Sequence, residues 1–246
     1  MARSVSDATF GFGINGLVRS VTGAIEAQSE TRKGLPTYIK VVGSNKLWTG
    51  EISGDVTDTA TISLTHEDKV ACDVVADGIS VNGWLTSFSC NGSSNSIVEF
   101  RAGVEGGKTS DTSTDPSTND PGDPVFLEEC TVTGISGDTA DIIDFSLDCS
   151  WELEHTFSTE EATLGEPTSD GTSFKSFDGT FVYTTSATAS DVITASGDTE
   201  TFSIVAGGLN ITGTGKVTKV EQTAEVDDIV RYKKTITVIS LADGSS

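Results

Sequence analysis

Two histidines, His66 and His155, are the side chains of this sequence best suited to acid–base or metal chemistry. They lie in the polar segments THEDK and ELEHT, without the HExxH or His-x-His spacing that a metal site uses. No GxSxG motif marks an activated serine. We therefore expect both histidines at the surface, and we predict no catalytic residue and no metal site.

The segment GFGING, residues 11–16, matches the GxGxxG pattern of dinucleotide-binding loops. Such a loop needs a buried strand before it and a helix after it. Only ten residues precede this segment, and the residues from Leu17 onward alternate as in a strand. We therefore predict a flexible entry into the first strand and no bound cofactor.

Aspartates recur every three or four residues near the middle of the chain, at Asp138, Asp141, Asp144 and Asp148. Calcium prefers oxygen ligands, but the ligand order of an EF-hand loop is absent. In a turn followed by a strand these carboxylates cannot all converge on one ion. We expect them to form a solvated face.

Four cysteines form two similarly spaced pairs, Cys72 with Cys90 and Cys130 with Cys149. Each pair falls on neighbouring predicted strands, which permits two hairpin disulfides. The start of the chain has no apolar core of signal-peptide length, and no later run reaches the roughly 20 apolar residues of a membrane span. We expect the chain to be made in the cytosol, which favours four reduced, half-buried thiols and leaves the disulfides as the alternative.

The formal net charge of −22 excludes a passive nucleic-acid binder, since binding phosphates requires clustered Lys and Arg. From Asp111 to Asp170 there are sixteen acids and no Lys or Arg. The first fifty residues are the more basic end, with Arg19, Arg32, Lys33, Lys40 and Lys46. Complementary ends suit self-association, while a solvated acidic surface that only confers solubility is the alternative.

Short alternating runs rich in Val, Ile, Thr and Phe predict an all-β chain of antiparallel β-sandwich or barrel units in tandem, with minor helix. Residues 106–125 are dense in Ser, Thr, Asp, Pro and Gly, which indicates a linker or exposed loop. We therefore divide the chain into a first unit at 1–105, the linker at 106–125, and a second unit at 126–246. The expected strands include Leu17–Ile25, Tyr38–Val42, Ala60–Leu64, Val70–Val75, Thr131–Ile135, Ile142–Leu147, Gly179–Thr185 and Glu200–Val205.

The ends of the two units align without a gap at an offset of 132 residues, Gly78–Val104 against Asn210–Ile236. Apolar positions agree while exposed positions differ, as expected for the core face of a shared two-strand hairpin. The matched pairs are Ile79 with Ile211, Gly83 with Gly215, Leu85 with Val217, Phe88 with Val220, Ile97 with Ile229, Val98 with Val230, and Phe100 with Tyr232. This pattern predicts an internal duplication.

The hairpin from Gly78 to Gly107 resembles the closing strands of bacteriophage tail-tube (major tail) proteins. Those strands show a Gly, an apolar pair, a Thr-Ser-aromatic-Ser run, a polar turn and a final apolar strand. Here Gly83 and the run Leu85–Ser89 fill the first strand, and Ile97–Val104 the second. The second copy departs from the pattern, because Val220 replaces the aromatic residue.

The resemblance implies a virion structural subunit whose sheet joins those of its neighbours into a ring, with rings stacked into a hollow tube. Two units per chain imply a trimeric ring with pseudo-sixfold symmetry, other tail proteins as partners, no membrane, and DNA passing without specific binding. The segment SETRKGLPTYIKVV resembles the hairpin or loop that contacts the next ring, which makes Arg32, Lys33 and Tyr38 candidates for that contact. The channel-lining acidic candidates are Glu221, Glu225, Asp227 and Asp228.

Three other functions stay open at this point. A capsid decoration or other tail protein would also fit the acidity and the linker. A secreted carbohydrate- or surface-binding module would require Trp48, Trp84 and Trp151 to be exposed on one face. A glycosidase on a β-sandwich remains possible in principle, but the 37 acids do not single out a carboxylate pair, and we predict no enzyme.

Overall fold

The computed structural model describes residues 9–10, 17–27, 30–33, 39–42, 46–58, 64–67, 69–76, 79–111, 122–134, 142–158, 167–186, 199–224 and 230–243. These residues are almost entirely strand, and a 3₁₀ turn at Leu127–Glu129 is the helical element among them. The strands are β1 (Thr9–Phe10), β2 (Leu17–Ala27), β3 (Glu30–Lys33), β4 (Ile39–Val42), β5 (Lys46–Asp55), β6 (Ala71–Ala76), β7 (Ile79–Ser93), β8 (Glu99–Asp111), β9 (Thr131–Thr133), β10 (Ile142–Phe157), β11 (Pro167–Thr185), β12 (Glu200–Ala206), β13 (Leu209–Thr223) and β14 (Arg231–Asp243).

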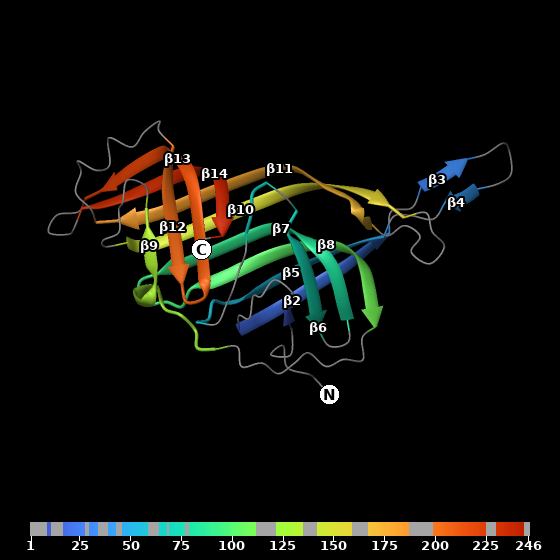
Figure 1. Cartoon of the computed structure of the whole chain (residues 1–246), viewed down its shortest axis with the longest axis horizontal. Helices are drawn as coiled ribbons and strands as arrows, with labels where there is room; N and C mark the ends of the chain where they lie inside the picture. Colours follow the sequence, from blue (N-terminus) through green and yellow to red (C-terminus); the bar gives the residue numbers. More distant parts are fainter. Residues whose placement is uncertain are drawn as a thin grey trace.

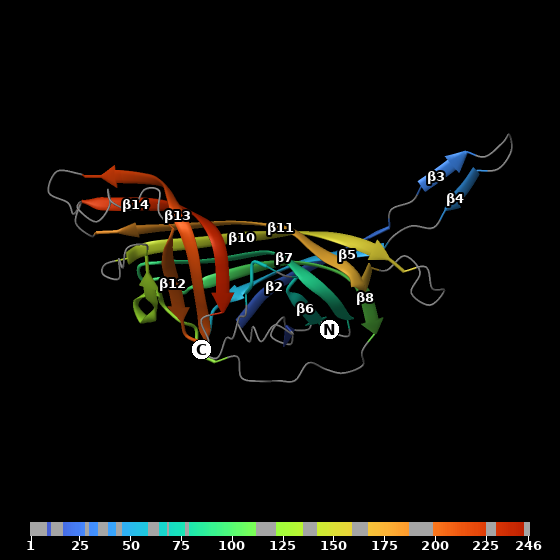
Figure 2. The ribbon, with the colours of Figure 1, turned by 45° about the horizontal axis from the view of Figure 1, so that its top comes forward.

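Twelve of the strands form one antiparallel sheet that curls into a half-barrel (Figures 1 and 2). Its order is β2-β5-β8-β7-β10-β11-β14-β13-β12-β9, with β6 also paired to β7 and β1 paired to β6. The hairpin β3–β4 forms a separate two-stranded sheet at one end of the molecule (Figure 1). The predicted all-β class is confirmed.

The sheet contains two six-stranded units with the same strand order. In the first unit the order is β2-β5-β8-β7-β6-β1, and in the second it is β10-β11-β14-β13-β12-β9. The hairpin β3–β4 lies between β2 and β5 in the first unit. The two units join where β10 pairs with β7.

The hairpins β7–β8 and β13–β14 agree in every detail of their pairing. Adding 132 to each number turns the pair Ile79↔Asp111 into Ile211↔Asp243, and Leu85↔Val104 into Val217↔Ile236. The two register shifts of the first hairpin, at Asn82/Gly83 and Leu85/Ser87, recur at Thr214/Gly215 and Val217/Lys219. Bulges fix the register of a strand pair, so their recurrence makes the two hairpins equivalent residue by residue.

The strand pairs β2–β5 and β10–β11 are equivalent in the same way, with other offsets. The shift at Val18/Ser20 in β2 matches the shift at Ile142/Asp144 in β10, which is an offset of 124 residues. Their partners, Gly54 and Thr185, differ by 131 residues. The offsets differ because the connections between strands have different lengths in the two units.

Glycine occupies the first bulge of both hairpins for a steric reason. A Cβ on Gly83 would meet the carbonyl oxygen of Glu105, and a Cβ on Gly215 would meet the carbonyl oxygen of Thr237. Glu105 and Thr237 are themselves equivalent at the offset of 132. The aligned glycines therefore serve one purpose, the close approach of two backbones at the bulge.

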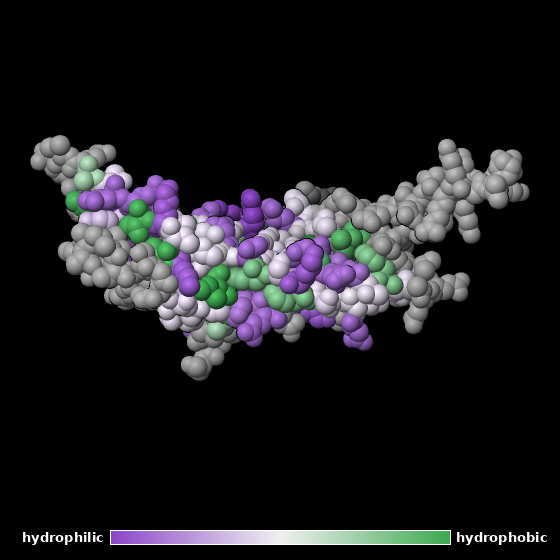
Figure 3. Space-filling view, turned by 90° about the horizontal axis from the view of Figure 1, so that it is seen from above, coloured by the Kyte–Doolittle hydropathy of each residue, from purple (hydrophilic) through white to green (hydrophobic). Residues whose placement is uncertain are grey.

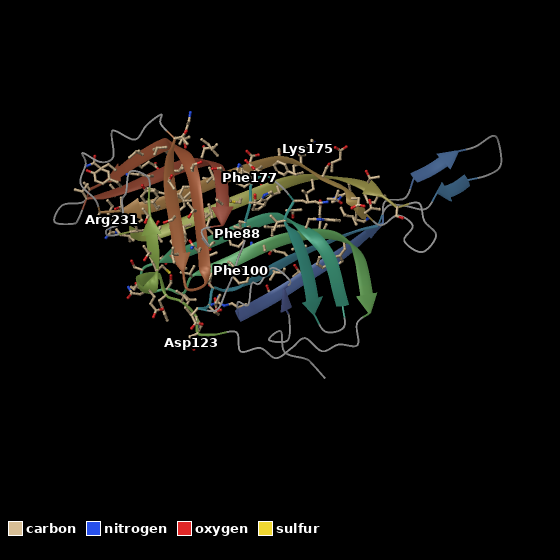
Figure 4. The ribbon with its side chains drawn as sticks, in the orientation of Figure 1. Phe88, Phe100, Asp123, Lys175, Phe177 and Arg231 are labelled. Carbon is tan, nitrogen blue, oxygen red and sulfur yellow. The ribbon has the colours of Figure 1, made fainter. Side chains whose placement is uncertain are left out.

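The core lies inside the curl and contains residues of both units. Alternation along β10 buries Phe145, Leu147, Cys149 and Trp151 and exposes the residues between them. The rings of Phe181 and Phe202 stack with centroids 4.5 Å apart. Figure 4 shows Phe88 and Phe100 in the middle of the sheet, where both are at most 2% exposed. The buried hydrophobic residues form one contiguous cluster, so the two units share a core.

The predicted linker is shorter than residues 106–125. Strand β8 continues to Asp111, so the first six of those residues are strand. At the other end, Val125 bonds to the first unit, donating its N–H to the Val56 oxygen at 3.0 Å and accepting from the Val98 N–H at 2.9 Å. Residues 112–121 lie outside the described residues. The linker thus ends as a segment packed against the first unit, with Val125 and Leu127 buried.

Candidate assembly interface

The junction between the units is a complete antiparallel ladder. Seven register pairs join β7 to β10, from Ser87↔Ser150 to Ser93↔Asp144. Phe88, Cys90 and Leu147 on its core face are at most 1% exposed. Pairing with β10 therefore covers the backbone edge of the second half of β7, which would otherwise be unpaired.

A polar cluster next to this ladder ties the two units together. His155 of β10 places Nε2 2.5 Å from Oε1 of Glu105 on β8, and its Nδ1 lies 3.0 Å from Oγ1 of Thr172 on β11. The His155 ring packs on Trp84 with centroids 5.5 Å apart, and Lys69 donates to the Thr172 carbonyl oxygen at 2.9 Å. The expectation that His155 is a surface residue is wrong, because only 8% of its side chain is exposed.

The Glu105–His155–Thr172 arrangement has the connectivity of a hydrolytic triad but lacks a usable nucleophile. Thr172 is 3% exposed, and its hydroxyl donates to the carbonyl oxygen of Thr168 at 2.9 Å. Because this hydrogen bond uses the hydroxyl proton of Thr172, that proton is not directed at His155, and the buried hydroxyl is not presented to a substrate. The cluster therefore positions strands, and the described residues contain no group of three potential metal ligands either.

His66 is also more enclosed than the sequence predicts. Its Nδ1 accepts a hydrogen bond from the Leu241 N–H at 3.1 Å, and its ring meets Phe177 edge-on at 6.1 Å. The side chain is 23% exposed. Figure 4 places Phe177 on β11, so His66 links the segment before β6 to β11 and β14 of the second unit.

A shallow open groove runs across β8, β7, β10 and β11 on the other face of the junction. Its lining includes the small side chains Ser87, Ser89 and Ser150 and the charged side chains Asp148 and Arg101. Phe88, Cys149 and Gly179 contribute apolar surface beside them.

Strand β13 has the same second half as β7 but no neighbour on that side. Strand β12 pairs with β13 only up to Gly215, and within the described residues nothing pairs with the same edge from Lys216 to Thr223. Val220, the equivalent of Phe88, is 37% exposed. Lys219 Nζ lies 2.9 Å from Glu221 Oε1, and this hydrogen-bonded contact lowers the pKa of the Glu221 carboxyl.

Strand β2 also presents an unpaired edge. Among the described residues β2 pairs with β5 alone, whereas its equivalent β10 pairs with both β11 and β7. Strand β2 begins the strand order in the first unit, and β13 lies in the second unit (Figure 1). Long unpaired edges are templates for pairing with another chain.

An ion cluster holds β2 in place against the sheet. Arg19 Nε donates to Asp55 Oδ2 at 3.0 Å, and Nη1 lies 2.5 Å from Glu99 Oε1. Asp55 is 2% exposed, and this burial raises the pKa of its carboxyl despite the opposing effect of Arg19. The cluster spans β2, β5 and β8, so the unpaired edge belongs to an ordered strand.

The sequence-predicted contact residues fall in two places. Arg32 and Lys33 lie on β3, in the β3–β4 hairpin, with register partners Lys40 and Ile39, while Tyr38 lies outside the described residues. Of the acidic candidates, Glu221 is exposed on the unpaired half of β13. Glu225, Asp227 and Asp228 lie outside the described residues.

The cysteines within the described part of the core are free thiols. Cys90 and Cys149 are buried and Cys130 is half-buried, which matches the favoured expectation and not the Cys130–Cys149 disulfide. Cys130 precedes β9, which pairs with β12 and not with β10. The prediction that Cys130 and Cys149 lie on neighbouring strands is therefore wrong. Burial raises the pKa of the Cys130 and Cys149 thiols to about 12. The side chain of Cys72 lies outside the described residues.

The three tryptophans do not form an exposed platform. Trp48, Trp84 and Trp151 are 8%, 7% and 3% exposed, and Trp151 Nε1 donates to the Thr65 carbonyl oxygen at 2.8 Å. The aspartates of the predicted solvated face are engaged locally: Asp144 accepts from Thr184, and Asp148 from Ser146. Asp138 and Asp141 lie outside the described residues.

Comparison with known proteins gives no relative: no family model matches the chain, and no curated protein matches it. Among the described residues there is no helix with the length and apolarity needed to cross a bilayer. The proposed function therefore depends on the fold and on the unpaired edges of β2 and β13.

Proposed function

We propose that this protein is a virion structural subunit, most similar to a phage tail-tube protein, that polymerises into stacked rings around a channel for DNA. One observation supports the proposal above the others. The chain holds two equivalent six-stranded units joined edge to edge in one sheet, and within the described residues one edge of β2 and the Lys216–Thr223 half of one edge of β13 have no neighbour. Repeating the same join between chains would continue the sheet from subunit to subunit. The equivalence of the units reflects an internal duplication.

The charge of the chain suits a conduit for DNA. A net charge of −22 repels phosphates, so a genome would slide past such a surface without adhering. Glu221 and the neighbouring acids Glu225, Asp227 and Asp228 are the candidates for the channel lining. Arg32, Lys33 and Tyr38 are the candidates for contact with the next ring, where they would meet acidic residues.

A capsid decoration or other tail protein is the second candidate. It uses the same fold and acidity, and it differs in ending as a discrete oligomer on another surface. The carbohydrate-binding module loses its specific support, because the three tryptophans that would stack on sugars are buried.

Negative-stain electron microscopy of the purified protein, across a series of protein and salt concentrations, tests the proposal. We expect rings or hollow tubes, with salt promoting assembly because it screens the repulsion between acidic subunits. Monodisperse monomers at every concentration, also in the presence of the other tail proteins, would overturn the tube function and leave the decoration protein as the better candidate.

A further inference from the structure

The junction between the two units is a template for a junction between two chains. Strand β10 docks on β7, and the equivalents of these strands are β2 and β13, whose corresponding edges are unpaired in the described structure. We propose that the edge of β2 in one copy pairs antiparallel with the Lys219–Thr223 segment of β13 in a second copy. This interface rests on the self-assembly in the proposed function and names the surfaces that carry it.

The register of the proposed ladder follows from the two offsets. Subtracting 124 converts β10 numbers to β2 numbers, and adding 132 converts β7 numbers to β13 numbers. Applied to the pairs of the existing junction, these conversions place Thr22 opposite Thr223, Gly23 opposite Gln222, Ala24 opposite Glu221, Ile25 opposite Val220, and Glu26 opposite Lys219. The pair Ile25–Val220 replaces Cys149–Phe88, and the pair Glu26–Lys219 replaces Ser150–Ser87.

The chemistry of these pairs favours the match. Glu26 and Lys219 carry opposite charges, and directly opposed charges of unlike sign stabilise a strand pair. Ile25 and Val220 are β-branched apolar residues, which pack well across strands. The register that brings these residues together follows from the bulge positions and the β7–β10 ladder, and it is independent of the chemistry of either pair.

The exposure of β13 agrees with a missing neighbour. In β7 the residues Phe88 and Cys90 are buried, while in β13 their equivalents Val220 and Gln222 are both exposed. The hairpin partner is the same in both cases, since β8 and β14 pair with β7 and β13 in the same register. One difference is the neighbour on the other side, which is β10 for β7. Seen from above, apolar side chains lie among hydrophilic ones at the end of the molecule formed by β13 and β14 (Figure 3).

The interface is head-to-tail, because each copy contributes two different surfaces. Figure 4 marks the far end of the β13–β14 hairpin by Arg231, the register partner of Thr223, and this end lies away from β2. A heterologous contact of this kind gives a closed ring when the rotation between copies closes, and an open filament when it does not. In either case every six-stranded unit meets the same kind of neighbour on each side.

Cysteine cross-linking tests the register directly. Directly opposed residues in antiparallel strands have Cα atoms about 4.5–5.5 Å apart, which a disulfide can bridge. In the variant carrying Glu26→Cys and Lys219→Cys, mild oxidation should give a ladder of covalent oligomers on a non-reducing gel. A 1:1 mixture of the two single variants should stop at covalent dimers, because each chain then has one new thiol. The variant carrying Glu26→Cys and Gln222→Cys is the matched control, since those positions are three residues out of register.

Charge reversal tests the same pair without a covalent bond. Glu26→Lys alone and Lys219→Glu alone should each raise the concentration for half-maximal assembly by about tenfold, since each makes like charges face each other. The doubly reversed variant should assemble as the wild type does. Mixing the two single variants should also restore assembly, but only into chains that alternate, so rings with an odd number of subunits should disappear.

The outcomes separate this interface from the proposed function. Assembly without the Glu26–Lys219 cross-link overturns the interface and leaves the tube function standing. Cross-linked oligomers that never form rings or tubes support the interface and overturn the tube function. Absence of both assembly and cross-link overturns both.

Discussion

The second halves of β7 and β13 have the same register, the same bulges and the same hairpin partner, yet opposite surroundings. Phe88 is 1% exposed, and its equivalent Val220 is 37% exposed. The residues differ accordingly: an aromatic side chain stands where β10 covers the strand, and a smaller apolar one stands where the described chain leaves it open. In a repeated sheet, the burial of a residue therefore depends on the neighbouring unit as well as on its own.

The largest contrast is expected from truncating the two equivalent residues. Phe88→Ala should lower the free energy of unfolding by about 3–5 kcal/mol, because it leaves a cavity in the shared core. Val220→Ala should change that of the monomer by about 0.5 kcal/mol or less, as for other exposed positions. Urea denaturation of dilute protein measures both. Equal losses of unfolding free energy in the two variants would contradict this difference, since they would mean that the β13 edge is already covered.

A second contrast concerns the polar cluster at the junction between the units. Glu105→Ala leaves His155 without its partner and should cost about 1–3 kcal/mol, the usual penalty for an unsatisfied buried polar group. Thr237→Ala, at the equivalent position of β14, is the control and should cost about 0.5 kcal/mol or less, because Thr237 is exposed. Thermal unfolding of the two variants at the same pH measures both losses of stability. A loss at Thr237 equal to that at Glu105 would contradict a role specific to the junction.

The sequence predicted the class and the repeated hairpin but not the junction. Alternating apolar residues mark single strands, and the β7–β8 and β13–β14 hairpins have turns of equal length, so a gapless offset finds them. The equivalence of β2 with β10 needs another offset, because the segment from Val18 to Gly54 is shorter than the equivalent segment from Ile142 to Thr185. Pairing of β7 with β10 joins distant residues that no local pattern connects. His155 is polar in sequence, and its burial depends on Glu105, fifty residues away.

A smaller effect is expected from pH, at the cluster that fixes β2. The pKa of Asp55 is raised in the folded state, so its contribution to stability is fully present below its unfolded pKa and is lost as pH rises through the folded pKa. Asp55→Asn removes this loss. The unfolding free energy of the variant should therefore increase relative to that of the wild type as the pH rises above about 3.8, the ordinary pKa of the carboxyl. A difference that is constant with pH would show that burial does not dominate the environment of Asp55.

The smallest effect is expected at Glu221, on the open half of β13. Its pKa is lowered by Lys219, so its contribution is present above its ordinary pKa and is lost as pH falls, which is the opposite sign to Asp55. Water and salt screen this exposed pair, so Glu221→Gln should change monomer stability less than any variant above. Denaturation at pH 7 and pH 3 measures the sign. A change as large as that of Asp55→Asn would indicate that Glu221 is shielded from solvent.

The β3–β4 hairpin has an equivalent in the second unit, the outer end of the β10–β11 pair. By the offsets of 124 and 131 residues, the pairs Glu30↔Val42 and Thr31↔Val41 correspond to Glu154↔Ser173 and His155↔Thr172. A closed assembly of such chains would thus carry a two-stranded end on every six-stranded unit, twice per chain. Image averaging that treats each six-stranded unit as the repeat would keep this density, and the number of such ends would be twice the number of chains in the ring.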